Sequence, residues 1–140
     1  MRIISLATSA LAAALAAAPL AAHHGDAGRY AEEVTTLDGT VVALQLINPH
    51  SIIIFNVTDA AGATETWQAE MGGPQQLSRN FGWDRTTLKA GDHIRVTGRV
   101  VKSGAPHINL TERARIVLLD SCKEIYTSRS EPEQPVDCES

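Results

Sequence analysis

The stretch TETWQAEMGGPQQLSRNFG, residues 64–82, decides the fold because it passes from a strand into one short helix. Residues 64–71 follow a turn at 59–62 and are expected to form the returning strand of a hairpin. Pro74 suits a first helical position and Gly82 suits the position just past a helix end. A single short helix directly after the third strand is therefore predicted.

Further strand patterns lie on both sides of this stretch. Residues 34–47 are rich in Val, Leu and Thr and are interrupted at Gly39, where a long strand can bend. Asn48-Pro49 ends that run, and 50–58, 93–100 and 107–119 supply three more strands. Three strands, a short helix and two strands predict an all-β, five-stranded OB-like barrel. The alternative is another five- or six-stranded barrel or sandwich.

The first 22 residues are typical of a secretory signal peptide. Arg2 provides the positive start, residues 3–20 are almost entirely apolar, and Ala21-Ala22 suit the peptidase. No Lys/Arg cluster follows, so no stable membrane anchor is expected after cleavage. The cleavage site is expected to follow either Ala21 or Ala22, and both alternatives remain open. Either product is periplasmic or secreted.

The mature chain has the length and charge of one acidic domain. Removing 22 of 140 residues leaves 118, with 11 basic and 16 acidic side chains. That balance does not favour a nucleic-acid partner. The expected organisation is a signal peptide at 1–22, an extended arm at 23–33, a barrel at 34–120 and a polar tail at 121–140. Cys122 and Cys138 could pair in an exported compartment.

Several motifs resemble a known family. They are His23-His24, Asn48-Pro49-His50, Trp67-Gln68-Ala69-Glu70 and Leu88-Lys89-Ala90-Gly91-Asp92. They resemble small exported bacterial proteins of uncharacterised function, a domain of unknown function whose members usually begin His-His-Ser. The resemblance runs from His23 to about Gly104. Gly25 stands where that family usually has serine, and the tail with its cysteines departs from the pattern. The resemblance implies export and fold, with no established activity.

The histidines are the residues most suited to chemistry. Cleavage after Ala22 gives His23 a free α-amine, which can bind a metal together with the imidazole of the same residue. Cleavage after Ala21 makes His24 the third residue, so that the amine, two deprotonated amides and an imidazole form a square-planar nitrogen set suited to Cu(II). His50 and His107 follow the two loops that flank the ligand face of OB-folds. The hairpin should return Glu70 and Met71 to the end where His50 lies. The candidate metal ligands are His23, His24 and His50, with Glu70, Met71 and His107 as secondary candidates.

Two functional hypotheses follow. The first is an exported metal-binding protein, with copper as the favoured ion. The second is a metal-free binding module that uses the face of the second and third strands for a periplasmic protein, peptide, glycan or other small ligand. Enzyme activity is not indicated, because no catalytic or cofactor-binding motif appears and Ser51 points away from the adjacent His50 along a strand.

Overall fold

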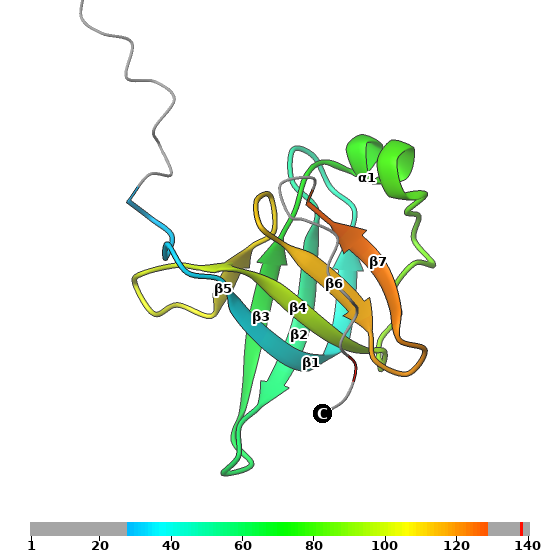
Figure 1. Cartoon of the computed structure of the whole chain (residues 1–140). Helices are drawn as coiled ribbons and strands as arrows, with labels where there is room; N and C mark the ends of the chain where they lie inside the picture. Colours follow the sequence, from blue (N-terminus) through cyan, green and yellow to red (C-terminus); the bar gives the residue numbers. More distant parts are fainter. Residues whose placement is uncertain (1–27, 129–137, 139–140) are drawn as a thin grey trace, which may run out of the picture.

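The computed structural model describes residues 28–128 and Cys138. Its elements are β1 (Thr35–Gln45), β2 (Ile52–Thr58), β3 (Thr64–Glu70), α1 (Pro74–Phe81), β4 (His93–Val100), β5 (His107–Asn109), β6 (Arg115–Leu118) and β7 (Lys123–Thr127) (Figure 1). The expected signal peptide, its cleavage site and His23-His24 lie outside the described residues. Within them, no helix has both the length and the apolar character needed to span a bilayer.

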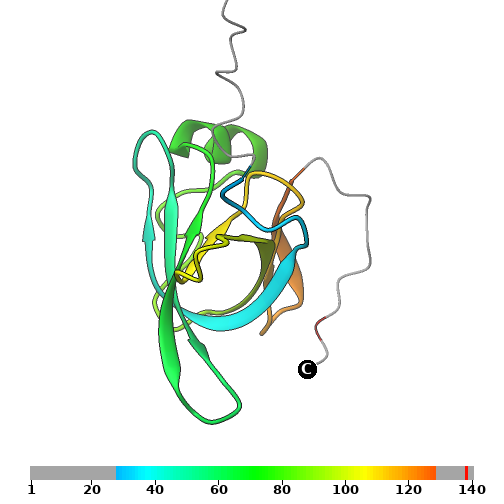
Figure 2. The same ribbon diagram turned by 90° about the vertical axis from the view of Figure 1, so that its left-hand side faces the viewer.

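Five strands close into a barrel. β1 pairs with β2, β2 with β3, β3 with β5, β5 with β4, and β4 again with β1. The β3–β5 pair is parallel and the others are antiparallel. Figure 2 shows the strands curving round into a ring. The predicted OB-like barrel, with one short helix between the third and fourth strands, is confirmed.

The long first strand takes part in two sides of the barrel because it bends. Its first half pairs with β4 up to Thr40, and its second half pairs with β2 from Thr40 onward. A Cβ on Gly39 would lie 2.6 Å from the backbone oxygen of Asn56 and 2.7 Å from the Phe55 ring. Only a residue without a side chain permits this close approach at the bend.

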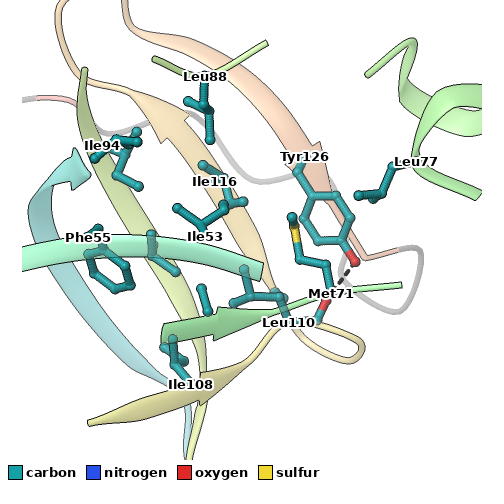
Figure 3. Close-up of a cluster of buried hydrophobic side chains, with 14 of the residues drawn as sticks. Ile53, Phe55, Met71, Leu77, Leu88, Ile94, Ile108, Leu110, Ile116 and Tyr126 are labelled. Carbon is teal, nitrogen blue, oxygen red and sulfur yellow. Dashed lines mark hydrogen bonds between the residues drawn. The ribbon is translucent and has the colours of Figure 1, made fainter. Parts of the chain in front are cut away.

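The core fills the barrel from alternate strand positions. Ile53, Phe55 and Ala69 are fully buried, whereas the intervening residues of β2 and β3 face outward. α1 closes one end, with Leu77 buried among core side chains (Figure 3). Met71 lies in the same cluster, next to Tyr126 in Figure 3. The helix therefore acts as a plug for the apolar interior.

The predicted fifth strand and the predicted tail both need correction. Residues 107–119 do not form one strand, because the chain leaves the sheet after Asn109 and returns at Arg115. Asn109 Oδ1 accepts hydrogen bonds from the backbone N–H and the hydroxyl of Thr111, and this turn ends β5. The segment expected to be a polar tail begins with β7, which pairs with β6. A disulfide joins Cys122 to Cys138.

The end of the expected arm packs on the barrel. Tyr30 is only 4% exposed and forms a β-bridge with Val101. Its ring stacks with that of His107, with the ring centroids 6.4 Å apart. The chain thus enters the barrel beside β5.

Candidate metal-binding cluster

Glu70 holds its carboxylate on the outside of the barrel. It is the last residue of β3, its neighbour Ala69 is fully buried, and alternation along the strand turns Glu70 to the other face. The register places Glu70 opposite Ile52 on β2 and opposite Asn109 on β5. Side chains arriving from either neighbouring strand can therefore reach it.

His50 reaches Glu70 from the loop between β1 and β2. The Asn48-Pro49 peptide bond is cis. Backbone hydrogen bonds from Ser51 N–H to Gly72 O and from Met71 N–H to Ser51 O fix the loop beside the end of β3. His50 Nδ1 contacts Glu70 Oε1. The expectation that the hairpin brings Glu70 back to His50 is confirmed.

His107 reaches the same carboxylate from β5. It lies opposite Gln68 in the parallel pairing, and Gln68 and Glu70 share one face of β3. His107 Nε2 lies 3.0 Å from Glu70 Oε2. The structure therefore joins three residues that are far apart in the sequence. We call His50, Glu70 and His107 the Glu70 cluster.

The contact between His107 and Glu70 is close without being a hydrogen bond. Nε2 of His107 is buried and has no hydrogen-bond partner, although Glu70 Oε2 is only 3.0 Å away. The 3.0 Å distance lies within hydrogen-bonding range, so distance alone does not account for the missing bond. Buried polar groups are normally hydrogen-bonded, and this nitrogen is one of two buried side-chain exceptions among the described residues.

The cluster combines protected and accessible members. The side chains of Glu70 and His107 are each 17% exposed, whereas that of His50 is 52% exposed. The described residues contain no group of three or more His, Cys, Asp or Glu side chains arranged to hold a metal ion. The cluster is best described as two imidazole–carboxylate pairs that share one carboxylate.

The remaining candidates, and the other described histidine, lie elsewhere. Met71 is fully buried in the core, because it follows Glu70 in the chain and turns to the opposite side. It offers no thioether to the cluster. His93 is exposed on β4 and pairs with Asp120 at 3.1 Å. His23 and His24 lie outside the described residues.

Sequence reasoning missed the contribution of Tyr30. The segment around it has no apolar periodicity, so nothing local separates it from the rest of the arm. Its stacking on His107 depends on pairing with Val101, a contact distant in sequence. A single aromatic residue in a polar arm was the only available signal.

Fold and site together define a small closed β-barrel that carries a carboxylate–histidine cluster on its outer wall. The chain belongs to a family of unknown function (DUF6152), whose model matches residues 10–109. The match includes all three members of the Glu70 cluster and His23-His24. The resemblance to a family of uncharacterised function is thereby confirmed. Comparison with curated proteins and with solved structures gives no match.

Proposed function

We propose that this is an exported metal-binding protein that takes up copper through its histidine terminus and the Glu70 cluster. The primary ligands are His23, His24 and His50, as the sequence suggests, and Glu70 and His107 complete or orient the set. The observation that carries the proposal is the position of the Glu70 carboxylate between ring nitrogens of two histidines.

The geometry of the His107–Glu70 pair supports a shared cation. Nitrogen and oxygen ligands lie roughly 2.0–2.2 Å from a bound zinc ion, and similar distances from copper leave adjacent ligand atoms about 3 Å apart. The Nε2–Oε2 distance of 3.0 Å fits that separation. A buried polar atom without a hydrogen bond costs about 1–3 kcal/mol. A cation between the two atoms would remove that cost.

The histidine terminus supplies the ligands that the described residues lack. Tyr30 stacks on His107, so the chain enters the barrel beside the cluster. Four residue steps separate His24 from Gly28, and these span at most about 14 Å when extended. Terminal amine and imidazole nitrogens suit Cu(II), which also binds such sites more tightly than other divalent first-row metals.

Copper titration of the exported protein tests the proposal, with the mature terminus first identified by intact mass. His50→Ala, and separately one extra residue before the mature terminus, should each lower copper affinity at least tenfold because each removes a ligand. His93→Ala is the matched control, since His93 is an exposed histidine paired outside the cluster. Tight binding that survives both changes would exclude the proposed site.

A metal-free binding module is the second candidate, favoured by apolar side chains on the outer wall. Val42 is 44% exposed and Ile47 is 51% exposed, and the outward Ile52 and Ile54 of β2 are half-buried. A protein or peptide partner would cover this surface. Under this candidate, Ile47→Asp abolishes a specific cross-link formed in the exported compartment, while Thr36→Asp, elsewhere on β1, leaves it intact.

A further inference from the structure

A hollow on the barrel surface lies where the entering chain crosses the loop between β4 and β5. Its volume is about 490 Å³, and it is lined by Gly28, Arg29, Val101, Lys102, Ser103, Ala105 and His107. His107 therefore both contacts Glu70 through Nε2 and contributes to the lining of the hollow.

Backbone contacts hold the two walls of this hollow together. Lys102 N–H donates to Arg29 O at 2.9 Å, and Val101 N–H donates to His107 O at 3.2 Å. The bridge between Tyr30 and Val101 adds a third link. The lining is thus arranged before any ligand arrives, which lowers the entropy cost of binding.

Among the described residues, the lining of the hollow carries two positive charges and no carboxylate. Arg29 and Lys102 line it and no acidic residue does. Three arginines elsewhere on the barrel each contact a carboxylate: Arg95 with Asp38, Arg99 with Glu112, and Arg115 with Glu124. Within the described part of the chain, neither Arg29 nor Lys102 has such a contact.

We propose that this hollow binds a phosphate group. The Arg29 guanidinium lies 5.4 Å from the centre of the Tyr30 ring, an arrangement that steadies it. A guanidinium can donate two parallel hydrogen bonds to a phosphate, and a lysine adds a point charge. The Ser103 hydroxyl is a further donor in the lining. This inference does not depend on copper binding, because the cations and the hydroxyl lie outside the Glu70 cluster.

The test is an NMR titration of the full exported chain with inorganic phosphate, in the presence of a chelator that removes copper. Saturable shifts confined to the amides of residues 28–29 and 101–107 are expected. Lys102→Gln and Arg29→Gln should each weaken phosphate binding about tenfold, because each removes a charge-assisted contact. A parallel titration with glycerol 3-phosphate distinguishes free phosphate from an esterified phosphate, and saturable binding of either supports the site.

Lys89→Gln is the matched control, since Lys89 is exposed and does not line the hollow. Equal weakening by Lys89→Gln and Lys102→Gln would show only general charge attraction and would overturn the proposal. The same shifts produced by sodium chloride at equal ionic strength, or no saturable shift with either phosphate compound, would also overturn it.

Discussion

The helix end of the barrel and the Glu70 cluster differ in how many of their buried polar atoms have hydrogen-bond partners. At the helix end, Phe81, Trp83 and Tyr126 form an aromatic plug, with the Phe81 and Tyr126 ring centroids 4.8 Å apart. Trp83 Nε1–H donates to Ile125 O at 2.8 Å and the Tyr126 hydroxyl donates to Leu110 O at 2.6 Å. The buried polar atoms of the plug are thereby satisfied.

The Glu70 cluster shows the opposite condition. His107 Nε2 is buried without a hydrogen bond, although a carboxylate lies within reach. A hydrogen bond to that carboxylate would remove the cost of leaving a buried nitrogen without a partner. The contrast teaches that the aromatic residues at the helix end are arranged for packing, whereas the cluster keeps a buried nitrogen that contacts a carboxylate without a hydrogen bond. Four variants probe this difference.

The largest effect is expected at the helix that carries the plug. Leu77→Ala should lower the free energy of unfolding by about 2–5 kcal/mol, because it leaves a cavity among buried side chains. Urea unfolding followed by tryptophan fluorescence measures it. Gln75→Ala on the exposed face of the same helix is the control and should change stability little. Equal losses would show that the buried position of Leu77 is not what sets its contribution to stability.

Gly73→Ala tests the junction between the two regions. A Cβ on Gly73 would lie 2.8 Å from Pro49 O, so either α1 or the His50 loop must shift. Overpacking of this kind costs about 1–3 kcal/mol. The same denaturant measurement gives the loss, and the shift should also disturb the His50–Glu70 contact. An unchanged midpoint together with unchanged His50 resonances would contradict the close contact.

Tyr126→Phe should cost about 1 kcal/mol, because Leu110 O loses its donor. Burial raises the pKa of Tyr126 above its ordinary value of 10.0. The unfolded chain therefore releases this proton first, and the neutral hydroxyl stabilises the fold below about pH 10. That stability falls as the pH rises from 10 through the folded-state pKa. Unfolding measured across this range should show a smaller alkaline loss in Tyr126→Phe than in the parent protein.

The smallest stability effect is expected at the cluster itself. Glu70→Gln keeps the side-chain shape and should change the metal-free stability by less than about 1 kcal/mol, since partly exposed ion pairs contribute little. Copper affinity should nevertheless fall about 10- to 100-fold, as it does when a carboxylate that orients histidines is removed. A large loss of stability with unchanged copper affinity would show that Glu70 serves the stability of the fold rather than metal binding.

Much of the barrel could be predicted because its signals are local. Alternation in β2 and β4, the hairpin turn, and Pro74 and Gly82 around α1 all act over a few residues. The break after Asn109 was missed because apolar residues continue beyond it, with Leu110 buried outside any strand. β7 was missed because its composition is largely polar and because it is held by residues distant in the sequence, as in the hydrogen bond from Trp83 to Ile125.

The cluster could be predicted only in part for the same reason. The meeting of His50 and Glu70 follows from hairpin register, which the sequence indicates. The approach of His107 depends on the parallel pairing of β3 with β5, whose partners lie about 40 residues apart. The rejection of Met71 follows from strand alternation once the end of β3 is known. Nothing local indicates the unbonded state of the His107 nitrogen.

The parallel pairing of β3 with β5 has a mechanical consequence. β5 is three residues long, and its pairing with β3 helps to close the barrel through Gln68–His107, Ala69–Ile108 and Glu70–Asn109. Glu70 and His107 stand on opposite sides of this closing seam. An ion or other ligand bound by both residues would hold β3 and β5 together. Binding should then slow the hydrogen exchange of the backbone amides along β5. This measurement does not depend on any spectroscopic signal of the ligand itself.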